Sequence, residues 1–133
     1  MHWVTKEAIA ALNRWVSEGE PAAEATRLAL NAERTGFELD ELGNALGGIR
    51  TSYVDAPVAV LSGLGNDDGL GRLFGTTNLF EGELLRQLYP TDADYVNAID
   101  KSNDAPVDSG FLVPADAALI KERARQVSIL EGL

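Results

Sequence analysis

Helical periodicity of apolar residues occurs at the two ends of this sequence, whereas the middle holds only short extended segments separated by turn residues. Apolar side chains recur every three or four residues within 5–18 and again within 81–127. Between them, residues 21–80 contain many glycines and a few short apolar runs. A complete doubly wound sheet needs more strands than this segment offers. We therefore predict an α+β fold with an N-terminal helix, a few short strands or a hairpin, and three C-terminal helices.

The first predicted helix has a broad apolar face. Its apolar side chains are Ala8, Ile9, Ala11, Leu12, Trp15 and Val16. Thr5 suits the N-cap position, and Gly19 followed by Pro21 ends the helix. A broad apolar face that includes a tryptophan indicates packing on a substantial surface. That surface can belong to another polypeptide.

The middle of the chain is predicted to form short extended segments. Residues 27–30 and 36–39 are candidates for extended structure, and 45–50 for the arm that returns after a turn at 40–44. Pro57 precedes a short apolar run at 58–61, which is typical of a buried strand. The glycine-rich residues 62–80 then form a long connection, with Leu70, Leu73, Phe74 and Phe80 as its predicted anchors.

Three helices are predicted in the last third of the chain. The first spans 81–89 and ends at Pro90, and the second spans 92–103 after Thr91 as its cap. The third begins at Pro114 and runs to 127, because proline is well tolerated in a first helical turn. The side chains predicted to point inward are Leu84, Leu85, Leu88, Tyr95, Val96, Ile99, Ala117, Ile120, Ala124 and Val127.

Charge and composition limit the classes of partner. The 133 residues suffice for one domain or part of one, and the net charge is −10. Such a charge repels nucleic acid and anionic lipid, so we expect neither a nucleic acid nor a membrane as partner. There is no cysteine and no apolar run of transmembrane length. Without a visible signal peptide, the chain is expected to be cytoplasmic if Met1 is the true start.

His2 is the only histidine of the chain, and therefore the first candidate for a general base. The sequence contains no Gly-x-Ser-x-Gly turn, so a nucleophile to work with His2 is not evident. An incidental terminal histidine is the alternative. Ser62 follows a strand-like run, but Val60 and Leu64 occupy the places where a nucleophile elbow needs glycine, which argues against that role.

The remaining polar motifs have simpler structural explanations. Residues 63–69 lack the Gly-Lys-Ser/Thr ending of a phosphate loop and the closing glutamate of a calcium loop, which favours a flexible surface loop. Three aspartates, at positions 100, 104 and 108, would share a helix face, but Pro106 favours a solvated acidic turn instead. Arg50 and Arg72 can bind a carboxylate or form internal ion pairs. We predict no metal site and no cofactor.

Several segments in a fixed order carry a family resemblance. They are ALNRWV (11–16) followed by Gly19 and Pro21, DELGNALGGIR (40–50), VDAP (54–57), LFGTT (73–77), LYP (88–90) and GFLVPADA (110–117). With these, the chain resembles the C-terminal portion of a family of large bacterial alpha/beta-hydrolase domain proteins. The resemblance covers nearly all of the chain, but none of the segments is a catalytic signature.

The resemblance implies a serine hydrolase that acts on esters or related acyl compounds. It makes residues 1–20 the last helix of the hydrolase core and residues 21–133 a C-terminal extension that forms a single compact unit. It also places His2 in the loop before that helix, as the triad histidine, although this histidine can equally lie upstream of Met1. The chain would be an inactive fragment or subunit whose partner is the hydrolase core or a second copy. The alternative is a non-catalytic domain that self-associates or binds another protein.

Overall fold

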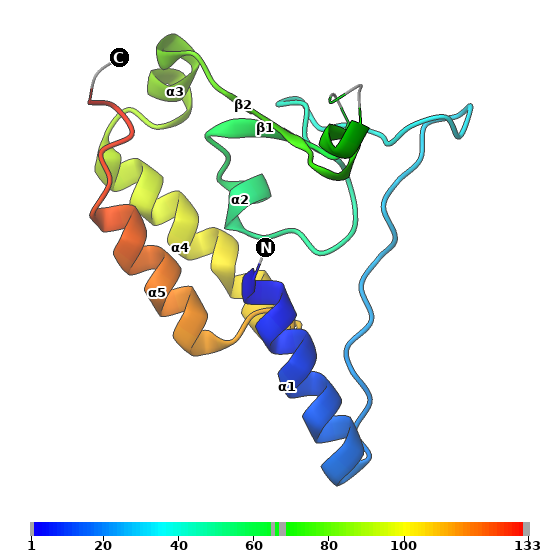
Figure 1. Ribbon diagram of the computed structural model, residues 1–133. Coiled ribbons are helices and arrows are strands. Elements are labelled where there is room, and N and C mark those ends of the chain that lie inside the picture. Colours follow the sequence, from blue (N-terminus) through cyan, green and yellow to red (C-terminus); the bar gives the residue numbers. More distant parts are fainter. Residues whose placement is uncertain (1, 65, 67–68, 132–133) are drawn as a thin grey trace.

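The structure of the chain, a computed structural model, describes residues 2–64, 66 and 69–131 (Figure 1). Its elements are α1 (His2–Glu18), α2 (Ser52–Asp55), β1 (Ala59–Ser62), the 3₁₀ helix η1 (Gly69–Leu73), β2 (Thr76–Leu79), α3 (Gly82–Leu88), α4 (Asp92–Asp108) and α5 (Pro114–Arg125). The two strands pair in antiparallel fashion, with Ala59 opposite Leu79 and Ser62 opposite Thr76. The predicted α+β class with a hairpin and three C-terminal helices is confirmed, but β2 lies within residues 62–80, which were predicted to form a connection.

The core lies where α4 and α5 pack on each other and on α2. Its buried side chains are Trp3, Ala56, Ile99, Leu112, Ile120 and Ala124, with Tyr95, Val96 and Ala117 packed against them. The inward positions predicted for α4 are thus confirmed. In α5 the prediction fails at one place, because Val127 lies beyond the end of the helix and is 55% exposed.

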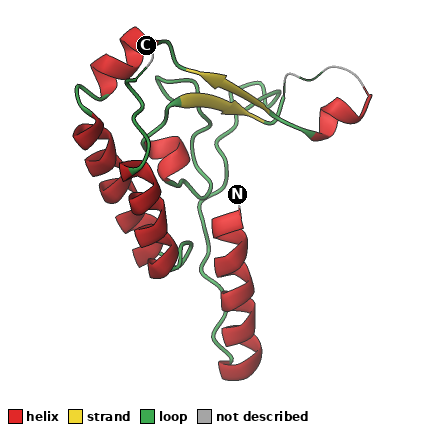
Figure 2. Cartoon of the chain, turned by 60° about the vertical axis from the view of Figure 1, so that its left-hand side comes forward, coloured by secondary structure: helices red, strands yellow, loops and turns green. Residues whose placement is uncertain are grey.

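Helix α1 reaches the core only through its first turns and projects away from the remaining helices (Figures 1 and 2). Trp3, Glu7 and Ala11 form its buried face. The predicted Thr5 cap is wrong, because the helix already begins at His2. The predicted end is correct: Gly19 has a φ of +75°, which favours glycine, and its N–H donates to the Trp15 carbonyl.

Helix α4 is longer than predicted, because Pro106 does not stop it. The Thr91 cap is confirmed as a capping box with Asp94, and the helix then runs to Asp108. Pro106 is buried in the last turns, where its missing N–H removes one hydrogen bond only. Its carbonyl accepts the N–H groups of Phe111 and Leu112 at 2.8 and 3.1 Å, which closes the helix end.

Residues 20–51 contain little regular structure. The segments predicted to be extended pair only through isolated antiparallel bridges, Leu30 with Phe37 and Leu39 with Ala45. The predicted turn at 40–44 is confirmed, because the Asp40 carboxylate accepts the backbone N–H groups of Leu42 and Asn44. The predicted strand at 58–61 is confirmed one residue later, as β1, but the prediction that it is buried is wrong, because only Ala59 of this strand is buried.

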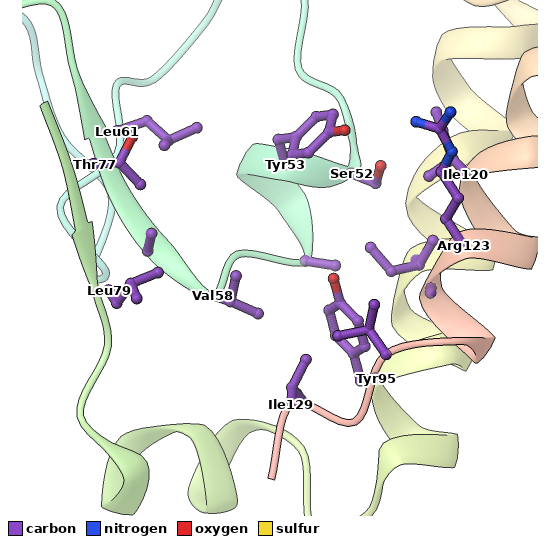
Figure 3. Close-up of a pocket in the computed structure, with 15 residues that line it drawn as sticks. Ser52, Tyr53, Val58, Leu61, Thr77, Leu79, Tyr95, Ile120, Arg123 and Ile129 are labelled. Atoms are coloured by element: carbon purple, nitrogen blue, oxygen red, sulfur yellow. The ribbon is translucent and has the colours of Figure 1, made fainter. Parts of the chain in front are cut away.

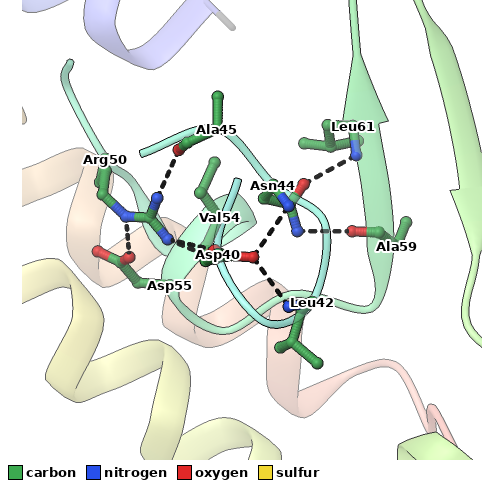
Figure 4. A network of polar contacts seen from close by, with 9 residues as sticks. All are labelled: Asp40, Leu42, Asn44, Ala45, Arg50, Val54, Asp55, Ala59 and Leu61. Carbon is green, nitrogen blue, oxygen red and sulfur yellow. Dashed lines mark hydrogen bonds and ion pairs between the residues drawn. The ribbon is translucent and has the colours of Figure 1, made fainter. Parts of the chain in front are cut away.

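Arg50 and Asn44 connect this irregular segment to the rest of the fold (Figure 4). The Arg50 guanidinium pairs with Asp55 at 2.6 Å and with Asp40 at 2.9 Å, and it also donates to the Ala45 carbonyl. The amide of Asn44, which is 1% exposed, accepts the Leu61 N–H and donates to the Ala59 carbonyl. Asn44 thereby supplies hydrogen-bond partners for backbone groups on the edge of β1 that does not face β2.

The Asp40 carboxylate makes the stability of this network depend on pH. Burial alone would raise its pKa, but hydrogen bonds from Arg50 and from the N–H groups of Asn44 and Leu42 hold the pKa below the ordinary 3.8. A carboxyl with a depressed pKa stabilises the fold above the unfolded-state value, and this contribution disappears as the pH falls through the folded-state value.

We therefore expect Asp40→Asn to be less stable than the wild type at neutral pH, and the difference to shrink as the pH falls below about 4. Urea unfolding at a series of pH values measures it, with Asp104→Asn on the exposed side of α4 as the control. A stability difference between wild type and Asp40→Asn that stays constant from pH 7 to acidic pH would contradict this assignment.

Candidate functional site

A pocket of about 460 Å³ lies between the hairpin, α2, α4 and α5 (Figure 3). This volume falls in the range of about 300–1,000 Å³ that is typical of small-molecule sites. Its lining residues are Ser52, Tyr53, Ala56, Val58, Ala59, Leu61, Thr77, Leu79, Tyr95, Ile99, Ile120, Arg123, Ala124, Val127 and Ile129. Most of them are apolar, and the pocket is therefore suited to a hydrocarbon or aromatic group.

One face of the hairpin forms a wall of the pocket. Ala59 and Leu61 on β1 lie opposite Leu79 and Thr77 on β2, and all four line the pocket. Side chains alternate between the two faces of a strand, so Asn78, between Thr77 and Leu79, lies on the other face. The antiparallel register thus fixes which hairpin residues an occupant would contact.

Polar groups gather at one end of the pocket. Figure 3 shows the hydroxyl groups of Ser52 and Tyr53 at the same end as the Arg123 guanidinium. Arg123 stacks on the Trp3 ring at 5.1 Å, and the Trp3 indole N–H donates to the Tyr53 hydroxyl at 3.4 Å. Lys6 lies over the same ring at 4.8 Å. The start of α1 therefore supports the polar end of the pocket.

Burial affects two phenols near the pocket. It raises the pKa of Tyr89 to about 12, and the Tyr89 hydroxyl donates to the Pro57 carbonyl at 3.1 Å. It also raises the pKa of Tyr95, whose ring meets that of Tyr89 edge to face at 5.2 Å. At neutral pH these groups offer hydrogen bonds and no negative charge.

Comparison with known protein families shows to which family the chain belongs. Residues 1–122 match the alpha/beta hydrolase domain family. The chain belongs to this family. The hydrolase match includes α1 and most of the residues that line the pocket, but it ends before Arg123, Ala124, Val127 and Ile129. No curated protein and no solved structure shows significant similarity to the chain.

His2, the predicted triad histidine, lies close to the pocket along the chain. His2 is the first residue of α1, so its predicted place in a loop before the helix is wrong, and its side chain lies outside the described part of the structure. The next residue, Trp3, contacts both Tyr53 and Arg123 at the rim of the pocket. The backbone of His2 is therefore one residue away from this rim. Its assignment as the triad histidine stays a prediction.

The other sequence candidates have structural roles where they are described. Ser62 ends β1, and its hydroxyl accepts the Leu64 N–H at 3.1 Å, as in a turn. Arg50 forms the internal ion pairs that were one of its two predicted roles. The side chain of Arg72 lies outside the described residues, as do residues 65, 67 and 68 of the glycine-rich loop.

The three aspartates predicted to lie in a turn are instead part of α4. Asp100, Asp104 and Asp108 are spaced by four residues and share one face of the helix. Asp100 pairs with Lys121 of α5. Among the residues that the structure describes, no group of three or more acidic or histidine side chains could hold a metal ion. No described helix has the length and apolarity needed to cross a membrane.

The sequence did not indicate the pocket. Its lining residues come from four separate stretches, within 52–61, 77–79, 95–99 and 120–129. Sequence periodicity identified Tyr95, Ile99 and Ile120 as core residues but gave no reason to place Arg123 beside them. The one available signal is that Arg123 lies one residue before the buried Ala124 on α5, where a long side chain can reach over an apolar surface.

Proposed function

We propose that this chain is the C-terminal part of a serine hydrolase that acts on esters or related acyl compounds. In this proposal α1 is the last helix of the hydrolase core, within residues 1–20, and residues 21–133 are an extension packed against that core. The observation that carries the proposal is the exposed apolar face of α1 in a chain of the alpha/beta hydrolase domain family.

The face of α1 opposite its buried side is apolar and exposed. Its large side chains are Ile9 (65% exposed), Leu12 (55%), Trp15 (55%) and Val16 (81%). The opposite side, with Trp3, Glu7 and Ala11, is buried against this chain. A helix that is apolar on the side away from its own domain is typical of one that packs between two bodies of protein. The missing hydrolase core would be the second body.

His2 would act as the general base of the complete enzyme. It would take the proton from the serine hydroxyl as that oxygen attacks the acyl carbon, and then return the proton to the leaving group. In alpha/beta-hydrolases the triad follows the order serine, acid, histidine along the chain. A histidine at the start of α1 comes after any core segment that supplies the serine and the acid. The chain alone would then be inactive.

Labelling by a fluorescent serine-directed phosphonate tests this proposal. The purified chain should show no labelling, whereas the polypeptide encoded upstream, with a Gly-x-Ser-x-Gly turn, should be labelled when it is produced together with this chain. His2→Ala should slow the labelling by about 1,000-fold or more. Asn13→Ala, an exposed residue on α1, is the matched control. Labelling of the isolated chain, at Ser62 for instance, would overturn the proposal.

The second candidate is a non-catalytic domain that self-associates through the same face of α1. It is favoured by the exposure of Ile9, Leu12 and Val16, since a symmetric dimer would bury them without any hydrolase core. The labelling experiment, combined with light scattering of the same samples, separates the two candidates. A complex with the upstream polypeptide supports the hydrolase, and a stable homodimer that His2→Ala and the upstream polypeptide leave unchanged supports self-association.

A further inference from the structure

We propose that the pocket between the hairpin, α2, α4 and α5 binds a medium-chain aliphatic carboxylate. The hydrocarbon chain would fill the pocket, and the carboxylate would lie at Arg123. This inference stands on the pocket of the chain itself and does not depend on the hydrolase proposal.

Several apolar side chains that line the pocket are exposed to water, and a bound hydrocarbon would cover them. Of its lining residues, Leu79 is 76% exposed, Val127 55% and Leu61 37%. Leu61 and Leu79 lie on the same face of the hairpin, across the pocket from the α4–α5 pair (Figure 3). A linear chain inserted between these walls would remove all three from water, which is favourable in proportion to the apolar area buried.

The positive charge of Arg123 at the polar end of the pocket favours a negatively charged ligand. Arg123 is the only charged residue among the described residues that line the pocket, and no carboxylate lies among them. The structure gives Arg123 no ion pair within the described chain, while it stacks on Trp3. The planar guanidinium of Arg123 at the rim can donate two parallel hydrogen bonds to one planar carboxylate.

The proposal predicts how affinity changes with ligand length. Calorimetric titration of the whole chain with decanoate should show binding, and decanoate should bind about tenfold more tightly than octanoate because two more methylenes are buried. Absence of decanoate binding would overturn the proposal, and so would equal affinity for the two acids. Failure of the hydrolase proposal would change neither result, because the titration uses this chain alone.

Two pairs of variants locate the ligand. Thr77→Trp should fill the pocket and weaken decanoate binding by at least about tenfold, whereas Asn78→Trp, on the other face of β2, should change it by less than about twofold. Arg123→Gln should weaken decanoate about five- to tenfold and leave decanol nearly unchanged, since only the charged head is affected. Arg125→Gln, on the same helix, is the control.

Two outcomes with these variants would overturn the proposal. Equal effects of the two tryptophan substitutions would place the ligand elsewhere and overturn the proposal. So would an equal loss of decanoate and decanol affinity in Arg123→Gln, because the guanidinium would then contribute only to packing. If Arg123→Gln unfolds because it loses its contact with Trp3, Arg123→Lys serves instead. The lysine variant keeps the charge but cannot donate two parallel hydrogen bonds, so we expect it to bind decanoate more weakly than the wild type and decanol equally well. An unchanged decanoate affinity would overturn the proposal.

Discussion

Replacing Trp3 by alanine is expected to lower the free energy of unfolding by about 3–5 kcal/mol, the usual cost of truncating a buried aromatic side chain. Trp3 is 3% exposed and belongs to the core cluster with Ile99, Leu112 and Ile120. It also carries the stacking contacts of Lys6 and Arg123. Urea unfolding followed by circular dichroism measures the change.

Trp15 provides the matched control on the same helix. It is 55% exposed in this chain, so Trp15→Ala should change the stability of the isolated chain by less than about 1 kcal/mol. If α1 is covered by a hydrolase core in the complete protein, the same substitution should weaken that association. Equal destabilisation of the isolated chain by the two alanine substitutions would contradict the orientation of α1.

Arg50→Met is the second large effect that we expect, with a loss of about 2–4 kcal/mol in the free energy of unfolding. The side chain of Arg50 is 24% exposed, and its guanidinium holds Asp40, Asp55 and the Ala45 carbonyl together. Its removal leaves the Asp40 carboxylate, itself only 20% exposed, without its cation. The irregular segment before α2 would lose its main connection to the fold.

Arg125→Met is the control for this prediction. Arg125 is 53% exposed, and its one ion pair among the described residues is with Glu122 at 3.3 Å on the surface of α5, so its removal should cost less than about 0.5 kcal/mol. Thermal and urea unfolding of both variants give the comparison. A loss below about 1 kcal/mol for Arg50→Met would show that the network in Figure 4 contributes little, because exposed ion pairs have that magnitude.

Local patterns in the sequence predicted the helices well. Thr91 and Pro114 identify where α4 and α5 begin, and Gly19 identifies where α1 ends, because capping and backbone conformation depend on a few neighbouring residues. Pro106 misled the prediction because burial of its ring compensates for one lost hydrogen bond. This compensation depends on tertiary packing, which the local pattern does not contain.

The sequence could not reveal which side of α1 faces this chain. Both sides carry residues that can be buried, and the periodicity of Ile9, Leu12 and Val16 is stronger than that of Trp3 and Ala11. In the structure, the side of α1 that carries Trp3 and Ala11 is buried, and on this side Glu7 pairs with Arg14 at 2.7 Å. The pocket was also beyond local patterns, since its walls come from segments far apart in the sequence.

The central claim is that the apolar face of α1 is covered by another protein surface. Light scattering of the purified chain over a range of concentrations tests it most directly, with Leu12→Lys/Val16→Lys to disrupt the face. Asn13→Lys/Ser17→Lys, which adds the same charge to the polar side of α1, is the control. We predict that the wild type and the control associate as concentration rises, while Leu12→Lys/Val16→Lys stays monomeric with the same circular dichroism. A wild-type chain that remains a monomer at every concentration would contradict the account.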